Sequence, residues 1–199
     1  TMLLNSLPKR EIICGYAEIL KHSLIKSRKF FLFLDKNLKK ILKLERKIIE
    51  RAILESCRIK KQIVEKDERE KNIRKSLNLG HTFGHAYEAT LNYSRKLNHG
   101  EAVLYGIYSA INLSKKLKKI SSKDYQLIAS HLAKLHFNDL KKFFNNKDLN
   151  KILSFMITDK KNTSKKINFI TLKKIGLVDI NNQLSTVYVK KFIKLSLLN

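Results

Sequence analysis

The chain has few of the residues that interrupt or cross-link a fold. Its 199 residues include one proline, six glycines, two cysteines and no tryptophan. So few helix breakers favour a structure made mainly of helices. Cys14 and Cys57 lie in segments with apolar periodicity. We therefore expect them to pack as small hydrophobic side chains rather than to form a disulfide or a metal site.

Long apolar runs and acidic side chains are also scarce. No window of about 18 apolar residues occurs, which excludes a transmembrane helix, and the first residues lack a signal-peptide pattern. We therefore expect a cytoplasmic protein. There are 17 acidic residues against 42 Lys and Arg, which gives a formal net charge of +25. Because the lysines are spread along the chain, we interpret this charge as a solvated basic surface rather than a nucleic-acid site.

Apolar spacing predicts one mainly helical domain over residues 1–199, a length that can bury a sizeable core. Ile and Leu recur three or four residues apart through most of the chain, as in amphipathic helices. Alternation over Lys166 to Leu172 predicts a strand that pairs with Gly176 to Ile180 in a small hairpin. Helices are predicted over Lys9 to Lys26, Phe30 to Leu34 (a single turn), Leu42 to Glu68, Ile73 to Asn78, His81 to Thr90, Glu101 to Leu117, Ser122 to Leu135, Leu149 to Thr158, and from about Ser185 onward.

Three of the six histidines stand next to glycines. His81 and His85 are four residues apart, so on a helix their rings share one face, which suits a divalent metal. Thr82 occupies the position where the zinc-protease pattern has its glutamate, so that class of enzyme is excluded. His99 falls at the expected start of the next helix, where it can return toward His81. The others are expected to be ordinary surface or core residues: His22, His131 and His136.

A metal site of two histidines needs a carboxylate, and Glu18 is the leading candidate. It lies in an otherwise apolar helical segment, where an unpaired carboxylate would be costly. Two His and one Glu form a familiar zinc site with a position open for substrate or water. Lys21, one turn later, suits an ion pair or a substrate contact equally well. Glu88 is expected on the helix surface, and Glu101 as an acidic residue favoured in the first turn of its helix.

Several blocks of the sequence resemble the motifs of 3-dehydroquinate synthases, in order and at similar spacing from Leu7 onward. The most specific is Leu77-Asn78-Leu-Gly80-His81-Thr-Phe-Gly84-His85-Ala-Tyr-Glu88. Others are Leu7-Pro8-Lys-Arg-Glu11, Gly15-Tyr-Ala-Glu18-Ile-Leu-Lys21, Asp67-Glu68-Arg-Glu70, His99-Gly100-Glu101 and Asp159-Lys160-Lys161. The resemblance implies a helical domain of the dehydroquinate synthase-like or glycerol dehydrogenase-like kind, with a small hairpin.

The resemblance also implies roles for individual residues. Zinc or cobalt would be bound by Glu18, His81 and His99. His85, which spacing alone would place on the metal, would instead act beside the departing phosphate. The substrate contacts and catalytic groups that it implies are Lys21, Lys60, Glu70, Arg74, Asn78 and Lys160, with Lys161 as the second choice at the phosphate.

The implied reaction converts 3-deoxy-D-arabino-heptulosonate 7-phosphate to 3-dehydroquinate with release of phosphate. It belongs to the shikimate pathway, which leads to chorismate and the aromatic amino acids, and it uses NAD. The family is usually dimeric and binds NAD in an amino-terminal Rossmann-like domain with a glycine-rich turn, which does not occur in this sequence. We therefore expect a fragment of a two-domain enzyme that binds NAD poorly and does not turn over alone. Asn98 stands where the family often has leucine.

Three other interpretations remain open. Another sugar-phosphate cyclase, such as a 2-deoxy-scyllo-inosose synthase, would keep the metal residues but use a substrate without a carboxylate, and Arg74 and Asn78 argue against it. A basic helical nucleic-acid-binding module would explain the charge but not the glycine-flanked histidines, and no helix-turn-helix or zinc-finger pattern occurs. A metal-free scaffold protein would also leave those histidines unexplained.

Overall fold

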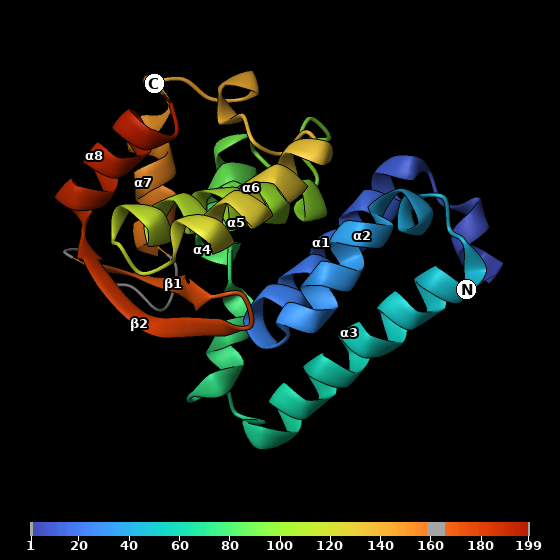
Figure 1. Ribbon diagram of the computed structural model, residues 1–199. Coiled ribbons are helices and arrows are strands. Elements are labelled where there is room, and N and C mark those ends of the chain that lie inside the picture. The colour runs from blue at the N-terminus through green and yellow to red at the C-terminus, as the bar shows by residue number, and fades with distance from the viewer. Residues whose placement is uncertain (1, 159–165, 199) are drawn as a thin grey trace.

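The computed structural model describes residues 2–158 and 166–198, which form a mainly helical structure with one β-hairpin (Figure 1). Helices α1 to α3 lie together on one side, and the hairpin and the later helices lie on the other. The predicted fold class is confirmed. The helices are α1 (Lys9–Lys26), α2 (Arg28–Leu42), α3 (Arg46–Lys66), α4 (His81–Thr90), α5 (His99–Lys116), α6 (Ser122–Lys134), α7 (Leu149–Thr158) and α8 (Thr186–Ser196), with 3-10 turns at Met2–Ser6, Ile73–Asn78 and Leu140–Lys142.

The first three helices differ in part from the prediction. The bounds of α1 agree with it, but the single turn expected near Phe30 belongs to the 15-residue helix α2. The Ser27 side chain caps this helix by accepting a hydrogen bond from the Phe30 amide. The helix expected from Leu42 begins at Arg46 instead, because the chain turns through Leu44 with φ +58°. Side chains at helical spacing bury one face of α2: Phe30, Phe31, Leu34, Leu38 and Ile41.

Helices α4 and α5 pack with their backbones in close contact. A Cβ atom at Gly106 would lie 2.0 Å from the carbonyl oxygen of Gly80, and one at Gly84 would lie 3.0 Å from that of Ala102. Gly80, which precedes α4, has φ +83°, a conformation that side chains disfavour. Glycine is therefore required where these two helices meet, and the contact fixes the histidines of α4 relative to His99 of α5.

The hairpin consists of β1 (Lys166–Lys174) and β2 (Leu177–Ser185), which are antiparallel and pair Ile167 with Leu184. Strand β1 ends two residues after the predicted strand, and β2 ends five residues after the predicted Ile180. The amide of Leu172 donates a hydrogen bond of 2.9 Å to Ser114 Oγ, so β1 is tied directly to α5. Ser185 caps α8 by accepting from the amide of Tyr188, close to the predicted start of that helix.

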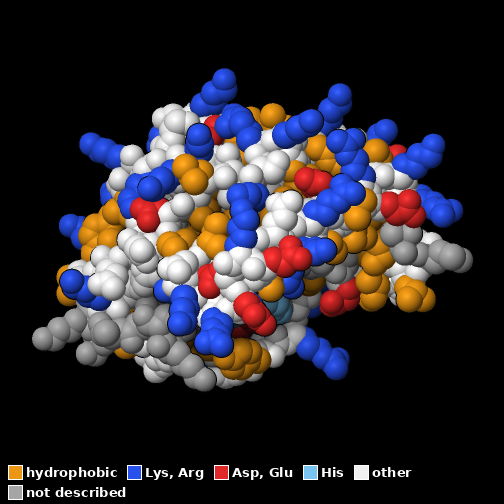
Figure 2. Space-filling model, turned by 90° about the horizontal axis from the view of Figure 1, so that it is seen from below, with side chains coloured by type: hydrophobic (Ala, Val, Ile, Leu, Met, Phe, Trp, Pro, Cys, Tyr) orange, Lys and Arg blue, Asp and Glu red, His pale blue; other side chains and the backbone are white. Residues whose placement is uncertain are grey.

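The distribution of charge can be seen on one face of the described chain. Figure 2 shows Lys and Arg side chains scattered over a whole face rather than gathered in one patch. No helix in residues 2–158 and 166–198 is long and apolar enough to cross a membrane. Both cysteines are free thiols. The prediction that both pack as apolar side chains is wrong for Cys57, which is exposed, whereas Cys14 is half-buried and donates to Asn98 Oδ1 at 2.8 Å.

Candidate metal and substrate site

Most of the predicted site residues line one pocket of about 250 Å³ between α1, α3 and α4. They come from separate parts of the chain, and the turn Ile73–Asn78 brings the last of them next to α1. The pocket contains three cationic and two acidic side chains. Its lining residues are Glu18, Lys21, His22, Lys60, Glu70, Arg74, Leu77, Asn78 and His81.

Glu18 and Lys21 form an ion pair on α1, with 2.8 Å between Lys21 Nζ and Glu18 Oε2. Lys21 is only 3% exposed, and burial lowers its pKa, although Glu18 opposes this. Burial raises the pKa of Glu18, but Lys21 and the nearby histidines lower it by a larger amount. The pKa of Glu18 is therefore below its ordinary value. Glu18 is therefore an ionised carboxylate at the pocket wall, and of the two roles open to Lys21 the ion pair is present.

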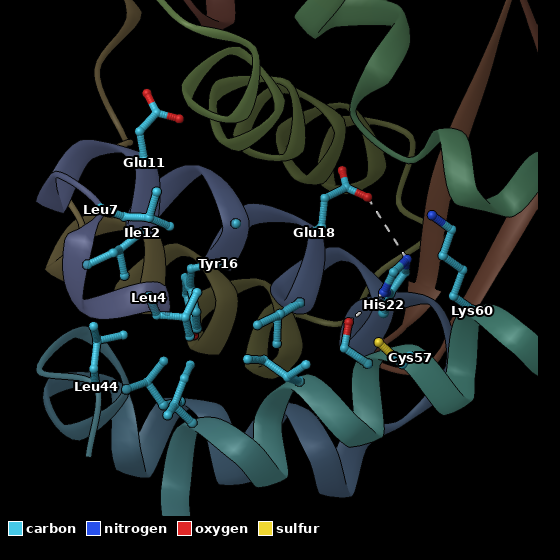
Figure 3. A pocket seen from close by; sticks show the side chains of 16 residues that line it. Leu4, Leu7, Glu11, Ile12, Tyr16, Glu18, His22, Leu44, Cys57 and Lys60 are labelled. Carbon is cyan, nitrogen blue, oxygen red and sulfur yellow. Dashed lines mark hydrogen bonds and ion pairs between the residues drawn. The ribbon is translucent and has the colours of Figure 1, made fainter. Parts of the chain in front are cut away.

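His22 lies beside Glu18 on α1 (Figure 3). Its Nδ1 is 2.7 Å from Ser56 Oγ, and its Nε2 is 4.0 Å from Glu18 Oε2. Nε2 is buried without a hydrogen-bond partner in the part of the chain that the structure describes. Burial, reinforced by the charge of Lys21, lowers the pKa of His22 to about 4. The ring is therefore neutral. It is buried as expected of a core residue, but it is not satisfied, because Nε2 has no hydrogen-bond partner among the described residues.

A loop between α3 and the turn Ile73–Asn78 is organised by Asp67. Its carboxylate accepts hydrogen bonds from three backbone amides, those of Lys71, Asn72 and Arg74, at 2.9, 2.7 and 3.0 Å. The motif comparison had included Asp67 without giving it a role. An aspartate that begins a turn and bonds to following amides is a common local signal, so this role could have been predicted.

This loop places Glu70 and Arg74 at the pocket. Glu70 accepts a hydrogen bond of 2.7 Å from Asn78 Nδ2. The guanidinium of Arg74 donates to the backbone oxygen of Glu68. These two hydrogen bonds hold Glu70 and Arg74 in place at the pocket.

Three histidines meet beside Glu18. The ring centroid of His81 lies 5.2 Å from that of His85 and 5.7 Å from that of His99. The centroids of His85 and His99 are 5.9 Å apart. His81 Nε2 is 3.9 Å from Glu18 Oε1. Burial and the charge of Lys21 lower the pKa of His81 to about 3, so its ring is neutral, as a metal ligand must be. The four residues that the sequence singled out are thus neighbours.

His99 is held at the first position of α5 by a capping box. Asn98 Oδ1 accepts from the Glu101 amide at 3.1 Å, and Glu101 Oε2 accepts from the Asn98 amide at 3.0 Å. Arg10 donates to Glu101 Oε1 at 2.7 Å and ties this cap to α1. The helix therefore begins two residues before the predicted start at Glu101, because Asn98 is a strong N-cap residue.

Glu88 does not lie on the surface, and that prediction is wrong. The residue is 8% exposed, and its Oε2 is 3.0 Å from His99 Nδ1. On α4 it shares a face with His81 and His85 at positions i, i+4 and i+7. Among the described residues, His85, Glu88 and His99 form a group whose ligand atoms all lie within 4.8 Å of one another. Sequence reasoning missed it, although the helical spacing was the available signal.

The donor set fits a divalent metal. Imidazole nitrogens together with a carboxylate oxygen suit zinc or cobalt. His81 Nδ1 is 3.4 Å from the carbonyl oxygen of Leu79, so its Nε2 is the nitrogen that faces Glu18. Glu18 Oε1 is 3.9 Å from His81 Nε2, and Glu88 Oε2 is 3.0 Å from His99 Nδ1. Among the described residues, the group whose ligand atoms all approach one another is His85, Glu88 and His99, and not the predicted set of Glu18, His81 and His99.

Four further residues for which a role was predicted have different outcomes. Lys160 and Lys161 lie outside the described residues, so the structure does not place them. His131 is a satisfied core residue, as expected: its Nδ1 is 2.8 Å from Asp35 Oδ1, and its Nε2 is 2.8 Å from the hydroxyl of Tyr16. His136 is exposed.

Comparison with known proteins places the sequence among dehydroquinate synthases. Residues 15–162 match the family model described as 3-dehydroquinate synthase C-terminal. The chain is 53% identical over 195 residues to a 3-dehydroquinate synthase of Pelagibacter ubique, covering 98% of this chain and 53% of that protein. It is 39% identical over 188 residues to a 3-dehydroquinate synthase of Thermodesulfovibrio yellowstonii, covering 94% and 52%. The chain thus spans about half the length of these relatives.

Solved structures of other enzymes have a similar fold. A 2-epi-5-epi-valiolone synthase from Streptomyces hygroscopicus, with NAD+ and Zn2+ bound, superposes with a TM-score of 0.79 at 17% identity over 94% of this chain and 51% of that chain. A 2-deoxy-scyllo-inosose synthase complexed with carbaglucose-6-phosphate, NAD+ and Co2+ also gives 0.79, at 22% identity over 94% and 53%. At these identities the likeness establishes the fold alone. The family match over residues 15–162 establishes more: the chain belongs to the 3-dehydroquinate synthase family, where it corresponds to the C-terminal domain.

Proposed function

We propose that this chain forms the metal- and substrate-binding half of a 3-dehydroquinate synthase. The enzyme would convert 3-deoxy-D-arabino-heptulosonate 7-phosphate to 3-dehydroquinate and phosphate, in the cytoplasm, as part of aromatic amino-acid synthesis. One observation carries the proposal. Seven residues that the motifs imply line the same pocket of about 250 Å³, although they are spread from α1 to α4: Glu18, Lys21, Lys60, Glu70, Arg74, Asn78 and His81.

The charges of this pocket suit an anionic sugar. Lys21, Lys60 and Arg74 outnumber the two carboxylates that share the lining. Arg74 is suited to a substrate carboxylate, because a guanidinium can donate two parallel hydrogen bonds. Asn78 and Glu70, already bonded to each other, supply a donor and an acceptor for hydroxyl groups. Lys160 would bind the phosphate as a point charge.

We assign the metal to Glu18, His81 and His99. Glu18 and His81 border the pocket proposed for substrate, whereas Glu88 borders a second hollow together with His85 and His99. Zinc or cobalt bound there would polarise adjacent substrate hydroxyls, and NAD+ would accept and return a hydride. His85 lies beside the cluster and would exchange a proton near the departing phosphate.

The NAD site is assigned to a part of the enzyme outside this domain. Relatives are about twice as long as the part that matches. We propose that residues 1–199 form one domain, that an amino-terminal Rossmann-like half binds NAD, and that the whole enzyme is a homodimer. The isolated chain would then lack turnover.

An assay of the full-length protein that contains this chain tests the proposal. It should release phosphate from 3-deoxy-D-arabino-heptulosonate 7-phosphate, and addition of a chelator should abolish the activity. Arg74→Gln should raise KM for this acidic substrate. Activity confined to a heptulose phosphate without a carboxylate would overturn the proposed substrate in favour of another cyclase reaction. Steeply salt-dependent nucleic-acid binding without bound metal would overturn the enzyme assignment itself.

A further inference from the structure

The carboxylate of Glu88 is buried and bonded to a single nitrogen of the histidine cluster. Its residue is 8% exposed, and its Oε2 lies 3.0 Å from His99 Nδ1. Burying an ionised carboxylate is costly unless a donor compensates it. In residues 2–158 and 166–198, the ion-pair partner found for Glu88 is His99. The contact links α4 to the first residue of α5.

A carboxylate accepts hydrogen bonds and does not donate them, so this contact fixes which nitrogen of His99 carries the proton. Nδ1 must bear the hydrogen that Glu88 accepts. In a neutral ring, Nε2 is then left with a free lone pair. The side chain of His99 is 57% exposed, so this nitrogen is accessible to an ion from solvent.

His81 has the same arrangement with a different partner. Its Nδ1 lies 3.4 Å from the backbone oxygen of Leu79, and its Nε2 faces Glu18. Both histidines therefore have an acceptor on the Nδ1 side, which leaves Nε2 of each ring available to a metal. An acceptor on the second nitrogen orients a metal-bound histidine and makes it a stronger ligand.

We propose that Glu88 is a positioning residue that holds His99 as the Nδ1–H tautomer, so that Nε2 binds the metal. The inference rests on the proposed metal site at Glu18, His81 and His99. Glu88 would then contact a ligand of the metal, His99, and not the metal itself. This role also accounts for a buried acidic residue that no substrate contact explains.

The test compares metal binding by the 199-residue chain and its Glu88→Gln and Glu88→Ala variants. Titration with Zn2+ and with Co2+ should show affinity about 10-fold weaker for Glu88→Gln and up to about 100-fold weaker for Glu88→Ala. The Co2+ absorption spectrum should keep its shape, because the ligands stay the same. Glu55→Gln, which removes an acidic charge from the surface of α3, is the matched control and should bind both metals like the parent chain.

Nitrogen NMR of the histidine rings reads the tautomer directly. His99 should be protonated at Nδ1 in the metal-free parent chain, and this preference should disappear in Glu88→Ala. Unchanged metal affinity and an unchanged tautomer would overturn the inference. A loss greater than about 1,000-fold with an altered Co2+ spectrum would overturn it differently, by making Glu88 a ligand together with His85 and His99.

These readouts separate this inference from the proposed reaction. Metal binding and ring protonation are measured without substrate or NAD. A full-length protein that is inactive on the heptulosonate phosphate would leave the role of Glu88 intact. Conversely, an active enzyme whose metal affinity ignores Glu88 would refute the positioning role alone.

Discussion

Two histidine sites in this protein use the same side chain for opposite purposes. His131 is 0% exposed, and both of its ring nitrogens have protein partners on other helices, Asp35 and Tyr16. In the cluster of His81, His85 and His99, the rings face one another, and the contacts found for His81 and His99 hold Nδ1. A histidine whose two nitrogens are satisfied supports the fold, whereas one with a free nitrogen facing others can bind an ion.

The largest expected effect comes from breaking the open cluster. His81→Asn in the full-length enzyme should lose stoichiometric zinc, and its turnover should fall by more than about 100-fold. This loss should exceed that caused by removing a residue that only hydrogen-bonds to a metal ligand. Metal analysis and an assay of phosphate release would measure both.

The same analysis on His85→Asn should show zinc retained, with turnover reduced by about 100-fold or more. Zinc lost from His85→Asn would return His85 to the metal.

The support beneath the cluster should be the next most sensitive. Gly106→Ala would place a Cβ atom 2.0 Å from the backbone oxygen of Gly80. Because neither backbone can move without separating α4 from α5, the free energy of unfolding should fall by about 3 kcal/mol. Urea denaturation of the chain would measure it. A fall of less than about 1 kcal/mol would mean that the helices slide apart at little cost.

The satisfied site can be broken without touching the open one. Tyr16→Phe removes the hydroxyl that donates to His131 Nε2 and leaves that buried nitrogen unpaired. The free energy of unfolding should fall by about 1–3 kcal/mol. Zinc affinity of the folded chain should be unchanged, because His131 has no part in the cluster. Weaker zinc binding in this variant would contradict the separation of the two sites.

Acid should weaken the satisfied site in a predictable direction. Burial lowers the pKa of His131 below 6.5, even though Asp35 opposes this. As the pH falls below about 6.5, the unfolded chain therefore binds more protons than the folded chain, and stability decreases. The hydroxyl of Tyr16 favours the neutral ring, so the decrease should be shallower in Tyr16→Phe. Unfolding curves measured from pH 7.5 to 5 in metal-free buffer would compare the two slopes.

The smallest effect is expected at Gly15, which serves as a control for the substitution of Gly106. Gly15 is an exposed residue of α1, and a Cβ atom there would meet nothing within 4 Å. Gly15→Ala should raise the free energy of unfolding by about 0.5–1 kcal/mol, because alanine loses less conformational freedom in a helix. Thermal unfolding would detect this change, and a loss of stability would show that the space is filled in solution.

The sequence predicted most of the helices, and the residues that gather at the pocket, better than the contacts around them. The ends of α1 and α7 agree with the prediction because apolar spacing and flanking residues mark them. Glu88 was misjudged because its burial depends on α5, which packs against α4 from a different part of the chain. The turn at Leu44 was missed for a similar reason, since its φ of +58° has no glycine to announce it. Contacts between distant segments decide such features, and local periodicity does not report them.

The capping box of α5 has a consequence for how long an ion would stay bound. The first turn of a helix is the part that frays most readily, and His99 is its first residue. If His99 is a ligand as proposed, each local opening of this turn would carry the imidazole away, and the breaking of the Asn98 and Glu101 bonds would set a route for escape of the ion. An occupied site would in turn slow that opening. The rate of hydrogen exchange at the amide of Glu101 would therefore be expected to follow the rate at which the metal dissociates.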